Sequence, residues 1–320
     1  MGFKASLVNI VRERLTPFLK YVRYDRTYAH QSDLLILGET LLTAKMALWD
    51  TPKMPFIPSF WDDYGFRVFS QNNEDGLIQY IIHHTDIPSR SFIEFGVEDY
   101  SECNTRFLIM HNNWSGLVMD GSEKAMQDLR RQNIYIRRQI ESKSAFITRD
   151  NINSLISSSG YSGKIGLLSV DIDGNDYWVL EAIECIQPQI LICEFNPLFG
   201  AEEKVAIPYK EDFYRHSAHY SGYYYGASLN AFTHLANSRG YKLVCINNLG
   251  NNAFFVKKDA TDLPEVTPMQ SWRGPMHREA TDKQGNFTFM SYADGRKLLA
   301  DMPVIDTVTG QARRIGDLKA

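Results

Sequence analysis

The stretch YKLVCINNLGNNAFFVK, residues 241–257, is the part of the sequence that says most about the fold. Its two apolar runs, Tyr241–Ile246 and Ala253–Lys257, are predicted strands because they are rich in β-branched and aromatic residues. The turn between them is too short for a crossover helix, so the two strands pair antiparallel as a hairpin. A sheet that ends in such a hairpin differs from the all-parallel dinucleotide-binding sheet of dehydrogenases.

Upstream of this hairpin, short apolar runs alternate with helical stretches, which is typical of a parallel α/β sheet. The other predicted strands are Ser91–Val97, Gly116–Met119, Ile134–Arg138, Ile165–Val170 and Gln189–Cys193. The predicted helices are Glu74–His83, Glu123–Gln132, Arg149–Ser157, Trp178–Ile183 and Ser228–Arg239. We therefore predict a Rossmann-like α/β fold: seven strands, one of them antiparallel in the C-terminal hairpin, with helices on both faces.

The chain is predicted to have three regions, of which residues 67–258 form the α/β domain. Residues 1–66 hold an N-terminal helical extension, including the periodic run Leu34–Leu48, and a proline-rich connector that helices cannot cross. Residues 259–320 are polar and irregular, with short elements such as Gly295–Asp301. We interpret this last region as a lid or packing extension.

Charge and composition limit the partners and the compartment. A formal net charge of −4 is not typical of polyanion-binding proteins, so nucleic acid is not expected as a partner. No stretch approaches the ~20 apolar residues of a membrane-spanning helix. The four cysteines lack zinc-site spacing and are expected to be reduced thiols of a cytoplasmic protein.

The first 26 residues predict an amphipathic helix with a basic polar side. Its apolar positions are Phe3, Leu7, Ile10, Val11, Leu15, Phe18, Leu19 and Val22. Such a helix can lie on an anionic membrane surface, here the inner membrane. The alternative is that it packs on its own domain or on a second copy in a homo-oligomer. We prefer this alternative to membrane binding.

The first predicted strand and its turn read FIEFGVE, residues 92–98. In α/β sheets, ligands bind at the carboxyl ends of the strands, where Glu94 and Gly96 lie. We expect Gly96 to let the backbone approach a cofactor, and Glu94 to bind an amino group of that cofactor. A glycine needed only for the turn is the alternative.

The second predicted strand ends in Asp120, followed by Gly121 and Ser122. Asp120 comes 24 residues after Gly96, close to the ~20-residue interval at which a carboxylate accepts hydrogen bonds from an adenosine ribose. A carboxylate here would repel the extra phosphate of NADP. The alternative is that Asp120 only caps the helix that follows.

The fourth and fifth predicted strands end in further acids. Asp171 and Asp173 follow the fourth strand, and their charges repel unless a proton, cation or donor lies between them. Glu194 and Asn196 follow the fifth strand. Asp173, Glu194 and Asn196 together suit Mg²⁺, which prefers oxygen ligands. The equal alternative is that the site holds no metal ion.

Two further groups are candidates. Gln71, in an amide-rich run before a predicted helix, can reach a cofactor carboxylate. Residues 210–228 concentrate tyrosines with His216 and His219, and a histidine there can act as general base for a hydroxyl. We take His219 as that base; a buried structural histidine is the alternative.

Five segments of the chain carry a family resemblance: SQNNEDG, FIEFGVEDYSECNTRFL, NWSGLVMDGS, LLSVDIDGNDYWVLEAI and GNNAFFVKKD. They resemble the FkbM-like branch of class I S-adenosylmethionine-dependent methyltransferases, over roughly residues 67–258. The resemblance implies the seven-stranded methyltransferase sheet and methyl transfer to a hydroxyl, often on a glycan or polyketide. Glu94, Gly96 and Asp120 match the family's cofactor positions, and Asp171 and Asp173 match its acidic block. The chain lacks the second glycine of the cofactor loop, which leaves room for a member that does not catalyse.

The expected function is therefore that of an O-methyltransferase in bacterial surface polysaccharide or related glycan biosynthesis. Its acceptor would be a glycan, a nucleotide sugar or a lipid-linked sugar. Asp171 and Asp173, with His219 or a bound cation, would orient and deprotonate the acceptor hydroxyl. The expected cofactor-binding residues are Gln71, Glu94, Gly96, Asp120, Gly121, Ser122 and Asp171. The alternatives are a non-catalytic scaffold in a glycan assembly complex and, disfavoured by the hairpin, a nicotinamide oxidoreductase.

Overall fold

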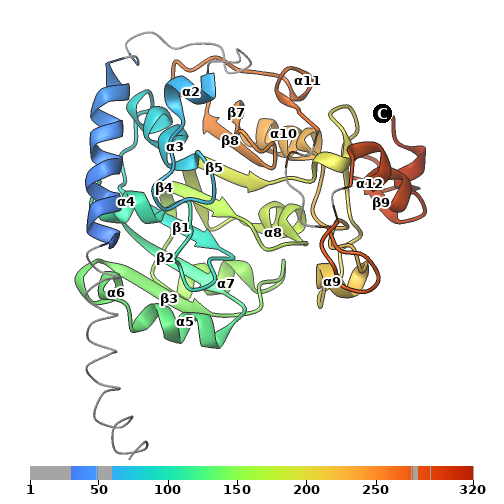
Figure 1. Cartoon of the computed structure of the whole chain (residues 1–320), viewed down its shortest axis with the longest axis horizontal. Helices are drawn as coiled ribbons and strands as arrows, with labels where there is room; N and C mark the ends of the chain where they lie inside the picture. The colour runs from blue at the N-terminus through green and yellow to red at the C-terminus, as the bar shows by residue number, and fades with distance from the viewer. Residues whose placement is uncertain are drawn as a thin grey trace, which may run out of the picture.

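The computed structural model describes residues 30–47, 49, 60–274, 276, 280–288 and 290–319. The amphipathic helix expected in the first 26 residues lies outside them. A helix at residues 30–46, dark blue in Figure 1, confirms the helix predicted from the periodic run Leu34–Leu48. In the described part of the chain, no helix is both long enough and apolar enough to span a membrane.

Seven strands form the central sheet in the order β3-β2-β1-β4-β5-β8-β7 (Figure 1). Their bounds are Ser91–Phe95 for β1, Ser115–Asp120 for β2, Ile140–Ser144 for β3, Gly163–Val170 for β4, Ile186–Glu194 for β5, Tyr241–Ile246 for β7 and Asn252–Lys257 for β8. The strands from β1 to β5 pair in parallel, whereas β8 is antiparallel to both β5 and β7. The predicted α/β fold and its terminal hairpin are confirmed.

Helices cover both faces of this sheet. Their bounds are Phe60–Tyr64 for α2, Glu74–His83 for α3, Arg106–Met110 for α4, Glu123–Arg130 for α5, Asn133–Arg137 for α6, Ile152–Ser158 for α7, Asp176–Ala182 for α8, Arg215–Ala218 for α9, Leu229–Ser238 for α10, Pro268–Ser271 for α11 and Tyr292–Leu298 for α12. Serine side chains cap α5 and α10, where Ser122 and Ser228 accept hydrogen bonds from backbone N–H groups of the first turn.

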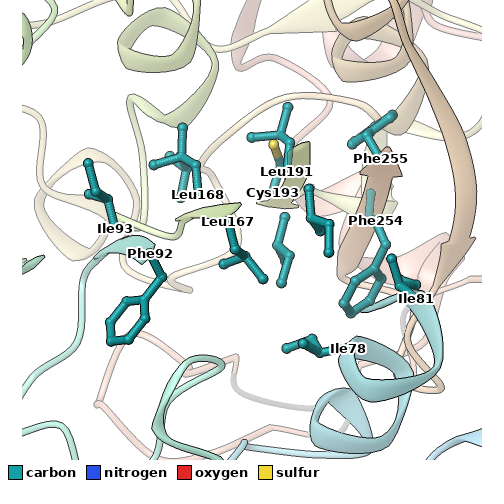
Figure 2. Packing of buried hydrophobic residues seen from close by; sticks show 14 of the residues in the cluster. Ile78, Ile81, Phe92, Ile93, Leu167, Leu168, Leu191, Cys193, Phe254 and Phe255 are labelled. Atoms are coloured by element: carbon teal, nitrogen blue, oxygen red, sulfur yellow. The ribbon is translucent and has the colours of Figure 1, made fainter. Parts of the chain in front are cut away.

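The core lies on both sides of the central strands, as a parallel sheet between helices requires. Figure 2 shows Phe92, Leu167 and Phe254 on the face that Ile78 and Ile81 of α3 cover. Ile93, Leu168 and Phe255 point to the opposite face. Because both faces are buried, the central strands have the near-continuous apolar sequences from which they were predicted.

One predicted strand, Ile134–Arg138, was wrong. These residues belong to α6, and the strand at this edge is β3, a few residues further on. β3 has the sequence IESKS and, among the strands that the structure describes, pairs only with β2. An edge strand tolerates polar residues because one side of it faces solvent, so β3 carries little apolar signal.

A second, three-stranded sheet joins the end of the chain to the segment that follows β5. Its order is β10-β9-β6, with β6 at Val205–Ala206, β9 at Pro303–Asp306 and β10 at Ala312–Arg314. Fully buried residues of both segments, among them Val205, Ile207, Leu299 and Val304, form a second apolar cluster. The region predicted as a lid or packing extension is therefore paired to a segment about a hundred residues earlier in the chain. Its role as a lid stays a prediction.

Candidate functional site

A cleft lies at the carboxyl ends of the parallel strands. It consists of a cavity of about 670 Å³ and a neighbouring one of about 250 Å³. The two share the lining residues Gly96, Glu98, Asp171, Asp173, Tyr214 and Arg215, so they lie next to each other. β1 pairs with β2 on one side and β4 on the other, which makes this the topological switch point where open α/β sheets bind ligands.

The loops that line the cleft have unusual backbone conformations. Gly96 has a φ of 71°, a left-handed conformation that glycine adopts without steric cost. Among the described residues, the non-glycine residues with positive φ are Glu98, Tyr100, Asn113 and Asp173. Three of these follow β1 or β4 directly. Strained backbone of this kind concentrates at ligand sites.

Glu94 lies at the end of β1 and lines the larger cavity. It is only 4% exposed, and its carboxylate accepts hydrogen bonds from the backbone N–H groups of Asn104 at 2.8 Å and Thr105 at 3.0 Å. Burial raises the pKa of Glu94 to about 7, although these hydrogen bonds oppose the shift. Glu94 therefore both fixes the start of α4 and presents a titratable group to the cavity.

Asp120, at the end of β2, lines the smaller cavity with Gly121. Its carboxylate accepts from the backbone N–H of Glu98 at 2.8 Å and of Ser122 at 2.7 Å. Asp120 thus joins the loops after β1 and β2, and each carboxylate oxygen keeps a further lone pair for a ligand. Ser122 caps α5 and does not line the cleft.

Three carboxylates meet at the larger cavity, and two of them, Asp171 and Asp173, also line the smaller one. Asp171, Asp173 and Glu194 each place a carboxylate oxygen within 4.8 Å of the others. Burial, and next to it mutual repulsion between the acids, raises the pKa of both Asp171 and Glu194 well above the usual range. Arg215 forms an ion pair with Asp173, so the cluster includes one positive charge. Glu194 Oε2 has no hydrogen-bond partner among the described residues.

Asn196, predicted as a metal ligand, does not join this cluster. Its Nδ2 donates to the carbonyls of Tyr223 and Tyr225 at 2.9 and 3.0 Å, and its Oδ1 accepts from the N–H of Leu198. Asn196 is fully buried because it holds two chain segments together. Asp171 takes its place beside Asp173 and Glu194.

His219 also lies away from the cleft. Its Nδ1 is 2.8 Å from the hydroxyl of Ser221, and burial lowers its pKa. The cavity is lined instead by His216, one helical turn earlier, together with Tyr214 and Tyr225. The sequence led us to take His219 of this aromatic segment as the base, whereas the turn of α9 places His216 beside the cavity.

Gln71 lines the larger cavity, as expected of a cofactor-binding residue, together with Asn72. Asp75 holds their loop in place. It is 1% exposed, and its Oδ2 accepts from the backbone N–H groups of Val68, Phe69 and Ser70 at 2.7 to 2.8 Å. Burial raises the pKa of Asp75 to about 6.

No family model matches the chain, and no curated protein matches it. Similar solved structures include an O-methyltransferase from Bacillus cereus in complex with SAH, 13% identical, with a TM-score of 0.38 over 72% of this chain and 91% of that one. The CurJ carbon methyltransferase is 11% identical, with a TM-score of 0.38 over 79% and 71%. M. capricolum TrmK with S-adenosyl-homocysteine is 11% identical, with a TM-score of 0.33 over 58% and 70%. At such values the strand order, and not these likenesses, defines the fold.

Proposed function

We propose that this chain is an S-adenosylmethionine-dependent methyltransferase that acts on a hydroxyl group of a saccharide. The observation that carries the proposal is the pair of adjacent cavities at the switch point, with acids at the ends of β1, β2, β4 and β5. The resemblance of five sequence segments to FkbM-like enzymes supports the same activity. It also suggests a role in glycan biosynthesis in the cytoplasm.

The residues of the cleft fit this cofactor. S-adenosylmethionine carries a sulfonium and an ammonium group, and an acidic cavity favours both. Glu94 is placed to accept from the ammonium. Gln71, which lines the same cavity, can donate to the cofactor carboxylate.

The smaller cavity fits the nucleoside. Asp120 has lone pairs left for the two ribose hydroxyls. Phe146, whose side chain is 54% exposed, lines this cavity and offers a flat apolar surface to the base. When bound, the cofactor supplies an electrophilic methyl group.

The acid cluster would then act on the acceptor. Asp171 and Asp173 lie at the junction of the cavities, where they can orient an acceptor hydroxyl. The raised pKa of Asp171 also makes its carboxylate, when ionised, a stronger base towards that hydroxyl. His216, which lines the cavity, replaces His219 as the histidine within reach of the acceptor.

A bound Mg²⁺ is the second arrangement that the cluster supports. Asp171, Asp173 and Glu194 offer the oxygen ligands that such a cation prefers. Arg215 already supplies a positive charge there, through its ion pair with Asp173. We therefore propose a metal-independent reaction, which an assay with EDTA and with added Mg²⁺ tests directly.

Calorimetric titration with S-adenosylmethionine tests the proposal. We expect micromolar binding by the unmodified protein, loss of binding in Asp120→Ala, and unchanged binding in Glu141→Ala. Glu141 is an exposed acid of β3 outside the cleft and serves as the matched control. No binding by the unmodified protein would overturn the proposal. Binding without methyl transfer to any acceptor would favour the non-catalytic scaffold.

A further inference from the structure

We propose that the end of the cleft beside β5 and β8 is an acceptor subsite for an uncharged saccharide unit, and that Asn72 and Asn252 recognise its hydroxyl groups. The inference rests on the proposed function, because it assigns the part of the cleft that the cofactor would leave open. Both residues line the larger cavity.

The position of the subsite follows from the two ends of the cleft. Asp120 and Phe146 line only the smaller cavity, on the β2 side. Asn251 and Asn252 line only the larger one, on the β8 side, where Asn252 pairs with Glu194 of β5. A nucleoside held at Asp120 places the cofactor's methionine part across Gly96, so the β8 end remains for the acceptor.

The amide groups at this end offer unused hydrogen-bonding atoms. Asn252 is 5% exposed, and its Nδ2 donates to Glu74 Oε1 at 3.2 Å. This bond fixes the orientation of the amide, because a carboxylate only accepts. Asn252 Oδ1 and Asn72 Nδ2 then have no hydrogen-bond partner within the described ranges. One acceptor and one donor match a hydroxyl group, which both donates and accepts.

A buried carboxylate holds this amide wall together. Glu74, at the start of α3, is fully buried. Its Oε1 also accepts from Asn247 Nδ2 at 2.7 Å, and its Oε2 accepts from the backbone N–H of Asn72 at 2.7 Å. Glu74 therefore ties the loop before α3 to the β7–β8 hairpin. The recognition groups are preorganised on two elements that are far apart in the sequence.

The charge of the cavity decides the class of acceptor. Its lining carries seven acids: Glu98, Asp99, Glu102 and Asp173, and three whose pKa burial raises, Glu94, Asp171 and Glu194. The lining cation Arg215 is paired with one of them, Asp173. A phosphate group placed here would be repelled, and a polar uncharged ligand would not. The subsite thus favours an uncharged saccharide unit over the nucleotide sugars that the sequence left open.

The experiment measures transfer of a tritiated methyl group from labelled S-adenosylmethionine by the full chain. The acceptors are the methyl α-glycosides of glucose, galactose, mannose, rhamnose and fucose, and the 1-phosphates of glucose, galactose and mannose. We expect transfer to at least one glycoside and to none of the phosphates. Transfer to phosphates only, or to no acceptor by a protein that binds the cofactor, would overturn the inference. If the protein binds no cofactor, the proposed function itself is overturned.

Variants test the assigned residues with the accepted glycoside. We expect Asn252→Ala to raise the acceptor KM about tenfold, which corresponds to one lost hydrogen bond, while the Kd for S-adenosyl-homocysteine stays unchanged. Asn248→Ala, in the same turn but exposed and outside the cavity, should change neither. If Asn252→Ala does not fold, Asn72→Ala, at a half-buried position, takes its place in the same two measurements. An unchanged acceptor KM in both cavity variants contradicts the assignment.

Discussion

The carbonyl oxygen of Asp171 lies 1.6 Å from the point where a Cβ on Gly96 would stand. The loop after β4 therefore passes directly over the loop after β1, in the space that a side chain at position 96 would fill. Both loops line both cavities. The shape of the cleft depends on the absence of a side chain at this one position.

We expect Gly96→Ala to abolish cofactor binding, because the loop that carries Asp171 and Asp173 must move. The left-handed backbone adds a cost of about 1 to 3 kcal/mol in unfolding free energy. Gly160→Ala is the matched control: its φ is 79°, and nothing lies within 4 Å of its Cβ position. Urea unfolding and calorimetry of both variants measure the difference. Equal losses of stability with intact binding would contradict the steric role of Gly96.

Stability should fall as the pH rises from 5 to 8. Burial raises the pKa of Asp75 and Asp176 to about 6 and that of Glu94 to about 7. The folded state therefore binds these protons more tightly than the unfolded state does. The resulting stabilisation is complete below the unfolded pKa values near 4 and is lost as the pH rises through 6 and 7.

The expected difference in unfolding free energy between pH 5 and pH 8 is on the order of 5 kcal/mol. Urea midpoints at the two pH values measure it. Glu94→Gln should reduce the difference because the amide does not titrate. A protein that is equally stable at both values, or more stable at pH 8, would show that hydrogen bonds outweigh burial at these acids.

Removal of Arg215 should create or tighten a divalent cation site. The guanidinium is the positive charge that pairs with the acid cluster, so Arg215→Ala leaves three neighbouring carboxylates for a metal ion. We expect calorimetric titration with Mn²⁺ to give binding at least tenfold tighter in this variant than in the unmodified protein. Lys210→Ala, which removes an exposed cation paired with Asp212, is the control. Equal Mn²⁺ affinities would mean that Arg215 does not shield the cluster.

Phe146→Ala should weaken cofactor binding about tenfold, because stacking of a base on an aromatic ring contributes about 1 to 3 kcal/mol. The side chain is 54% exposed, so the melting temperature should hardly change. Phe287→Ala, at a 75% exposed phenylalanine outside the cleft, controls for the loss of any surface aromatic. If both variants bind S-adenosyl-homocysteine like the unmodified protein, the base does not lie on Phe146.

Most of the central sheet could be predicted from the amino-acid sequence, because the signals for its strands are local. Apolar runs mark strands that are buried on both faces, and the short turn of residues 247–252 forces an antiparallel hairpin. The residues at the carboxyl ends of those strands could be predicted as site residues in the same way. Glu94, Gly96, Asp171 and Glu194 line one cavity because parallel strands end at the same edge of the sheet, with Asp120 beside them in the smaller one. The polar edge strand β3 was misplaced because solvent exposure removes the apolar signal.

The other side chains that complete the cleft could not be predicted from the sequence, because they come together through long-range packing. Arg215 reaches Asp173 across 42 residues of sequence, and Glu74 reaches Asn252 across 178. Two predicted residues do not line the cleft for the same reason. Asn196 instead holds two chain segments together. The turn of α9 directs His219 away, while His216 lines the cavity. No periodicity or spacing encodes such contacts. They depend on where separate elements come to rest against one another when the core packs.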